Sequence, residues 1–166
     1  MNSRFFLVFS AALAAVWSPA FYASADVAVA AKHAESALAQ LFGAQRSDAQ
    51  TRAGMLSILD AVAAAATDAG LTDEWKAMIT GARRRISEGS LVDGESQLAL
   101  HQCYRQINEG KPFRMPEGIR SVDDAAASAR KLLESGPPLL RSGKSLEAVR
   151  ALLETALMIL TPIERG

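Results

Sequence analysis

The segment SLEAVRALLETALMIL, residues 145–160, repeats apolar side chains at intervals of three and four positions, the spacing of one face of an α-helix. The apolar residues cover nearly half of the helix circumference: Leu146, Val149, Leu152, Leu153, Ala156, Leu157, Ile159 and Leu160. Glu147, Arg150 and Glu154 mark the side expected to face solvent. Because so wide an apolar arc requires more than one partner helix, we expect this segment at the centre of a helical core.

The rest of the chain after residue 25 follows the same helical period, and no stretch keeps the two-residue alternation of a β-strand. Further amphipathic helices are predicted over residues 27–42, 47–70, 94–109 and 121–136, and a third helix from residue 72 with its apolar seam reaching Ile86. Short connections between such helices favour antiparallel neighbours. We therefore expect an all-α fold, an antiparallel up-and-down bundle of four to six helices, formed by residues 26–166 as a single domain.

Residues that start and stop helices support these limits. Ser47 and Gln50 have the spacing of a capping box, and Ser121 is expected to cap the fifth helix. Gly70 suits the left-handed position that follows a helix. The Gly-Pro-Pro sequence at residues 136–138 is predicted to end the fifth helix, because proline lacks the amide hydrogen that a helix interior needs.

Two apolar positions lead to further expectations about packing. Leu98 points nearly opposite to the apolar face of the fourth helix, which contains Cys103 and Tyr104. We therefore expect that helix to contact neighbours on two sides. Val122 begins the apolar stripe of the fifth helix, so we expect it to face the core.

The first 25 residues are organised like a secretory signal peptide. Arg4 supplies the positive charge, residues 5–17 form an apolar run too short to span a bilayer comfortably, and residues 23–25 (Ala-Ser-Ala) form a small-residue cleavage site. The mature chain is expected to begin at Asp26 and to be secreted. An uncleaved anchor is the alternative, because the apolar stretch extends toward Tyr22. The short charged region and the small cleavage residues are typical of bacteria, which would place the protein in the periplasm.

The balance of charge excludes several kinds of partner. The chain has 18 basic and 18 acidic side chains, so it lacks the excess of Lys and Arg with which proteins neutralise nucleic-acid phosphates. The same balance excludes a polybasic membrane tether, and loss of Arg4 with the signal leaves 17 basic and 18 acidic side chains. We expect no nucleic-acid partner and no membrane association after signal cleavage.

Cys103 is the one cysteine of the chain, so an intrachain disulfide is impossible. Its place in the apolar face of the fourth helix favours a small buried side chain. The alternative is an intermolecular disulfide, because an oxidising compartment would leave this thiol without a partner in its own chain.

Neither histidine belongs to a pattern of metal ligands. His33 and His101 each lie beside an apolar stripe, without the spacing to other ligands that a metal site shows. A metal shared with Glu35 or Glu95 would require the first and fourth helices to face each other. A haem would require an inward-pointing His or Met side chain. We predict no metal site and no cofactor.

Other motifs are explained by ordinary helix chemistry. The Gly-Lys-Ser sequence at residues 143–145 lacks the earlier glycine and the strand of a phosphate-binding loop, and Ser145 is expected instead to cap the last helix. The three arginines at residues 83–85 fan out around a helix, so the outer two are expected to pair with acids on adjacent helices. Asp123 and Asp124 start a helix and complement its dipole. With no catalytic constellation in the sequence, we predict that the protein is not an enzyme.

The segment EGKPFRMPEGIR, residues 109–120, is the most distinctive part of the mature chain. Its two prolines limit backbone freedom, and it mixes apolar with basic side chains. One interpretation is a loop pinned across the bundle by Phe113 and other apolar residues. The other is an exposed recognition loop with Phe113 and Arg114 as anchors, flanked by Lys111 and Met115. These four residues form the candidate binding site.

The sequence shows no family resemblance from which a role could be taken. The leading hypothesis is an exported, non-enzymatic helical bundle that binds an unknown protein partner, or a second copy of itself, through a helix face and the 110–120 loop. The alternative is a carrier that binds a small molecule or a metal inside the bundle. An enzyme is the third hypothesis.

Overall fold

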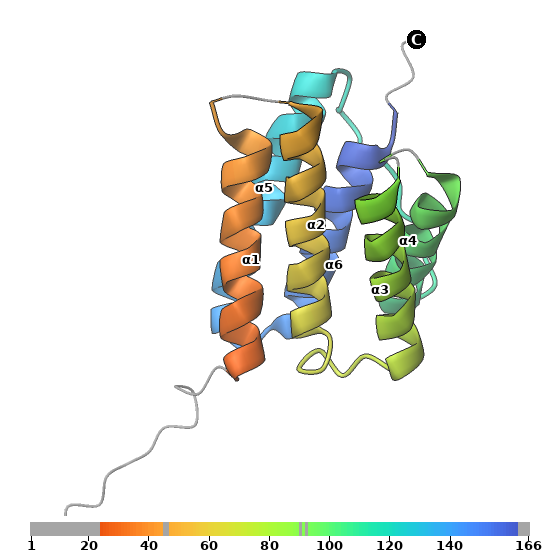
Figure 1. Ribbon diagram of the computed structural model, residues 1–166. Coiled ribbons are helices and arrows are strands. Elements are labelled where there is room, and N and C mark those ends of the chain that lie inside the picture. Colours follow the sequence, from red (N-terminus) through yellow and green to blue (C-terminus); the bar gives the residue numbers. More distant parts are fainter. Residues whose placement is uncertain (1–23, 45–46, 90, 92, 163–166) are drawn as a thin grey trace, which may run out of the picture.

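The computed structural model describes residues 24–44, 47–89, 91 and 93–162, and all regular secondary structure in these ranges is helical. The helices are α1 (Ala25–Phe42), α2 (Asp48–Ala65), α3 (Asp73–Glu88), α4 (Gly94–Ile107), α5 (Val122–Arg141) and α6 (Ser145–Leu160). Figure 1 shows them lying side by side as a bundle. The predicted all-α class is confirmed, and the six helices fall at the upper end of the predicted number.

The last helix, α6, lies at the centre of the bundle. It packs against α5, α2 and α4, while α1 packs on α2 and α5, and α3 packs on α2 and α4. Ten residues of α6 are buried, and the side chains of Leu152, Leu153 and Leu157 are 0% exposed. The expectation that the wide apolar arc needs several partners is therefore confirmed.

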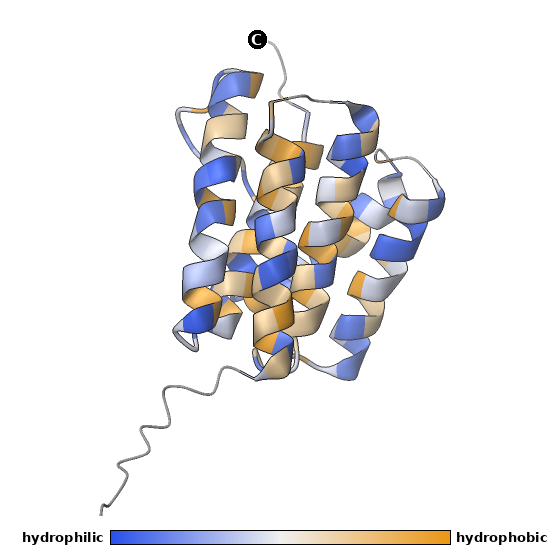
Figure 2. Ribbon diagram, turned by 60° about the vertical axis from the view of Figure 1, so that its left-hand side comes forward, coloured by the Kyte–Doolittle hydropathy of each residue, from blue (hydrophilic) through white to orange (hydrophobic). Residues whose placement is uncertain are grey.

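The contact between α1 and α2 depends on small side chains. Four of the six buried residues of α1 are alanines, which allow the two helix axes to approach closely. On α2, Gly54 lies against Leu41 of α1, and a Cβ atom at position 54 would be 2.4 Å from the Leu41 Cγ. Figure 2 shows hydrophobic and hydrophilic residues mixed along each helix, as amphipathic helices require.

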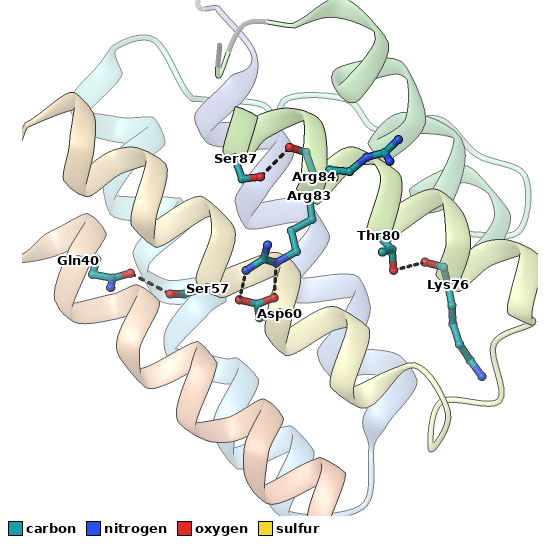
Figure 3. A network of polar contacts seen from close by, with 8 residues as sticks. All are labelled: Gln40, Ser57, Asp60, Lys76, Thr80, Arg83, Arg84 and Ser87. Carbon is teal, nitrogen blue, oxygen red and sulfur yellow. Dashed lines mark hydrogen bonds and ion pairs between the residues drawn. The ribbon is translucent and has the colours of Figure 1, made fainter. Parts of the chain in front are cut away.

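Polar side chains connect neighbouring helices at the rim of the core (Figure 3). Ser57 of α2 donates a hydrogen bond to Gln40 of α1 at 2.9 Å. Arg83 of α3 pairs with Asp60 of α2, with its Nη2 atom 3.1 Å from the Asp60 Oδ2. Arg85 pairs in the same way with an acid of α4. The predicted pairing of the outer arginines is confirmed; because these groups are partly exposed, they fix helix orientation more than they stabilise the fold.

The predicted caps at Ser47 and Ser121 are confirmed, whereas α2 ends at Ala65 with Ala66 as its cap residue, so Gly70 is left-handed in the turn that follows the helix and is not its cap. The Ser47 and Ser121 hydroxyls each accept a hydrogen bond from the backbone amide three residues later, at 3.2 and 3.1 Å. Gly70 has a φ of 73°. The amide of Leu71 donates to the Ala66 carbonyl at 3.0 Å across the turn that follows α2.

The predicted end of the fifth helix is wrong. α5 continues through residues 136–138 to Arg141, although Pro137 lies inside it. Burial explains this result: Pro137 and Leu140 face the core, and a Cβ atom at Gly136 would be 3.3 Å from the Leu152 side chain of α6. This packing offsets the backbone hydrogen bond lost at a proline. The helix ends before Gly143, whose φ is 78°.

Three further expectations are corrected by the structure. Ser145 does not cap α6: Lys144 occupies the cap position, and Ser145 is buried in the first turn, because the turn at Gly143 leads into the helix one residue earlier than expected. The fourth helix, α4, does contact two helices, α3 and α6, but Leu98 is 59% exposed, so neither contact covers its side of α4. Val122 is 66% exposed, because it lies in the first turn of α5 beyond the fully covered core.

The central position of α6 predicts unequal effects of two leucine substitutions on this helix. Leu153→Ala should lower the free energy of unfolding by about 2–5 kcal/mol, because it leaves a cavity among several helices. Leu146→Ala, at a position that is 39% exposed, should cost well under half as much. Urea denaturation followed by circular dichroism measures both. Equal losses would contradict the placement of α6 at the centre.

Candidate functional site

The connection between α4 and α5, residues 108–121, is named here the 108–121 loop. Its first turn contains two left-handed residues, Glu109 with a φ of 53° and Gly110 with a φ of 78°. The Arg105 Nε atom donates to the Gly110 carbonyl at 2.8 Å. At the other end, the amide of Arg120 donates to the Asp124 carboxylate at 3.2 Å. The loop is therefore held by hydrogen bonds at both ends.

Phe113 attaches the middle of the loop to the bundle. Its ring is half-buried and meets the Tyr104 ring edge to face, with centroids 5.8 Å apart at an angle of 88°. The His101 ring lies on the same side, with its centroid 6.1 Å from that of Phe113. Burial lowers the pKa of His101 below its ordinary value. The Phe113 ring thus covers the part of α4 that carries His101 and Tyr104.

The other three candidate binding residues differ in their exposure. Lys111 and Arg114 are exposed, whereas Met115 is half-buried. The Lys111 Nζ atom lies 3.1 Å from the Glu109 carboxylate. All four candidates belong to one loop, as the sequence requires, but the loop presents its two cations to solvent while its aromatic ring packs inward.

A partly buried polar contact between α4 and α6 corrects the expectation that Arg150 and Glu154 face solvent. Both are half-buried and turned toward α4. The Tyr104 hydroxyl donates to Glu154 at 2.6 Å, and Arg150 Nη2 donates to the Ile107 carbonyl at 3.2 Å. The reason is that the Tyr104 hydroxyl and the last backbone carbonyls of α4 are shielded from water, so they need hydrogen-bond partners within the protein. Burial and the hydrogen bond to Glu154 raise the pKa of Tyr104.

The two histidines lie on helices that do not form a principal packed pair, α1 and α4. The acids considered with them are engaged elsewhere: Glu35 forms an ion pair with Arg141, and Glu95 forms one with Arg85. Among the residues that the structure describes, no three His, Cys, Asp or Glu side chains are grouped to hold a metal ion.

Cys103 lies in the core, where its side chain is 0% exposed. The carbonyl of the same residue accepts a hydrogen bond from the Trp75 indole at 3.1 Å. Burial raises the pKa of the Cys103 thiol to about 12. An intermolecular disulfide stays a prediction, and it would require this thiol to leave the core, because a disulfide forms through an accessible thiolate.

An apolar cavity of about 410 Å³, named here the end pocket, opens at one end of the bundle. The final residues of α1 and α6 meet the first turns of α2 and α5 around it. Large apolar side chains form much of its wall: Leu41, Phe42, Met158, Ile159 and Leu160. Ala125 and Ala126 of α5 complete the wall and leave the space open.

Sequence reasoning missed the end pocket. Four separate helix ends form it, so no single stretch of sequence contains its pattern. The one signal in the sequence is the pair Ala125-Ala126, which places two small side chains near the start of the fifth helix. Such a run is also common in ordinary helix packing.

Comparison with known proteins adds no assignment. No protein-family model matches this chain, and no match is found among curated proteins or solved structures. In the described part of the chain, no helix combines the length and the apolar character needed to cross a membrane.

The buried thiol predicts a loss of stability at high pH. In the unfolded chain the thiol ionises near its ordinary pKa of about 8.5, whereas Cys103 in the folded protein keeps its proton to about pH 12. In this interval the unfolded state binds fewer protons, so the free energy of unfolding falls as the pH rises. This group contributes about 1.4 kcal/mol per pH unit.

Denaturation with urea at pH 8, 9 and 10 measures this contribution. The Cys103→Ala variant is the control, because it lacks the thiol but retains Tyr104, whose pKa is also raised. The difference in unfolding free energy between the two proteins should shrink as the pH rises. A constant difference across the series would show that the thiol is not buried as described.

Proposed function

We propose that this protein is an exported, non-enzymatic helical bundle that binds a protein partner through the 108–121 loop. The observation that carries the proposal is the rigid attachment of the loop: Phe113 and the hydrogen bonds at both ends hold it, while Lys111 and Arg114 remain exposed. A loop that is already ordered loses little conformational entropy when it binds. The partner surface is then acidic, to complement the two cations.

The proposal also covers the antiparallel order of the helices and the secretion of the protein. An up-and-down, antiparallel order of helices is supported by the short connections, residues 43–47 between α1 and α2 and 142–144 between α5 and α6. Secretion, to the periplasm of a bacterium, is supported by the signal-like sequence of residues 1–25. That sequence lies outside the described residues apart from Ser24 and Ala25.

Signal cleavage can be tested directly on the protein from its native host. We expect an intact mass that corresponds to a chain beginning at Asp26. Cleavage there removes Ser24, whose hydroxyl accepts a hydrogen bond from the Val27 amide at 3.2 Å and so caps α1. A mature chain that retains residues 1–25 would favour the uncleaved anchor and contradict this part of the proposal.

Binding through the loop predicts that reversing its charges abolishes partner capture. Lys111→Glu with Arg114→Glu should reduce the recovered partner at least tenfold, because two attractive contacts become repulsive. The matched control is Lys32→Glu with Lys131→Glu, which makes the same change of net charge at exposed positions of α1 and α5. Capture is measured by affinity purification from the native host, and folding by circular dichroism.

Equal capture by the loop variant and the wild-type protein would reject the loop as the binding surface. Equal losses in the loop variant and the control would show that only the net charge matters. If the captured protein is the same chain, the loop mediates self-association, and sedimentation should show a dimer that the loop variant does not form.

A carrier of small molecules is the second candidate function. The end pocket favours it, since a concave apolar cavity of about 410 Å³ has the size of ordinary ligand sites. The observation supports a carrier of an apolar molecule over a carrier of a metal, because the described lining contains no His, Cys, Asp or Glu.

A further inference from the structure

We propose that the end pocket binds the aliphatic chain of a neutral, single-chain amphiphile such as a fatty alcohol. The inference rests on the second candidate function, a carrier, and names the class of ligand. It follows from the shape of the cavity, from the absence of charge in its described lining, and from an exposed valine at its mouth.

The space in the pocket results from a mismatch of side-chain sizes. Ala125 and Ala126 of α5 face the cavity together with Met158 and Leu160 of α6, and the small methyl groups leave about 410 Å³ unfilled. The pocket opens to solvent at the end of the bundle, so its apolar walls are in contact with water, and removing apolar surface from water is favourable. A flexible hydrocarbon chain covers these walls and has the narrow cross-section that a cleft between helix ends accepts.

The lining is apolar and carries no charge among the described residues. Its polar side chains are Thr51 and Thr161, whereas 22% of the whole chain is charged. The Thr51 hydroxyl donates its hydrogen to the Ser47 carbonyl at 3.1 Å, so its oxygen is left to accept a hydrogen bond. The hydroxyl of an alcohol can donate that bond.

A carboxylate would be a poorer end group than a hydroxyl at this site. Among the described lining residues, no side chain supplies a cation to pair with it, and burying an unpaired charge is costly. Asp123 and Asp124 follow Val122 directly in the first turn of α5, and Arg120 precedes it, so the described charges beside this residue are of both signs. Neither α1 nor α6 carries a basic residue in its last turn. The end group is therefore neutral.

Val122 identifies the mouth of the pocket. It lines the cavity and is 66% exposed, the largest exposure among the large apolar side chains of the described surface. Such exposure costs free energy in water, which contact with a bound hydrocarbon chain would recover. We therefore place the exit of the ligand chain from the pocket beside Val122.

Titration with 1-decanol, followed by calorimetry and by thermal unfolding, tests the proposal. We expect saturable binding to the wild-type protein and a rise in its melting temperature. Ala126→Phe fills the pocket and should weaken binding at least tenfold. The matched control, Ala127→Phe, adds the same ring at an exposed position of the same helix and should bind as the wild type does.

A second variant keeps the test decisive if the ring introduced by Ala126→Phe disturbs folding. Val122→Asp places a charge at the exposed mouth, where the first turn of α5 tolerates an acid. It should also weaken binding at least tenfold and leave the circular dichroism spectrum unchanged. Decanoate, which has the same chain length, should bind the wild-type protein at least tenfold more weakly than decanol. Equal binding of decanoate would overturn the neutral end group.

An aromatic probe, N-phenyl-1-naphthylamine, separates failure of this inference from failure of the carrier function. If the wild type binds the probe but not decanol, and Ala126→Phe abolishes probe binding, the pocket is a carrier site for another class of ligand and the inference is wrong. If neither compound binds, both proposals are wrong. A dimer that Ala126→Phe abolishes, without ligand binding, would show a second copy in the pocket and overturn the inference.

Discussion

The structure depends on covering the apolar arc of α6. This arc is too wide for one partner, so α5, α2 and α4 all pack on it, and α1 and α3 complete the bundle around them. Packing of the helices around α6 also engages two side chains of α4 that could otherwise take part in chemistry. Cys103 is buried with a raised thiol pKa, and Tyr104 is bonded to Glu154. The 108–121 loop and the end pocket are not used in this packing, and they meet at Val122, the residue that follows the loop.

Helix positions could be predicted because each depends on local sequence. The caps at Ser47 and Ser121 need only a hydroxyl and an amide three residues later. The course of α5 through Pro137 could not be predicted, because it depends on contacts with α6, a separate segment of the chain. The orientation of Glu154 was missed for the same reason: its partner, Tyr104, lies on another helix.

For the candidate site, too, only the features that depend on local sequence could be predicted. Composition identified the 108–121 loop, because proline, aromatic and basic residues together are unusual in this chain. Composition could not show that Phe113 packs on Tyr104 while Arg114 stays exposed, since that choice depends on the space beside α4. The end pocket is a property of four helix ends in three dimensions.

The central claim is that α6 organises the bundle, and amide hydrogen exchange followed by mass spectrometry tests it most directly. Amides in the middle of α6, around Leu152 and Leu153, should exchange more slowly than those of any other helix, because they open only when the whole molecule unfolds. The outer helices α1 and α3 should exchange earlier. Exchange of α6 at the rate of α1, or before it, would contradict the account.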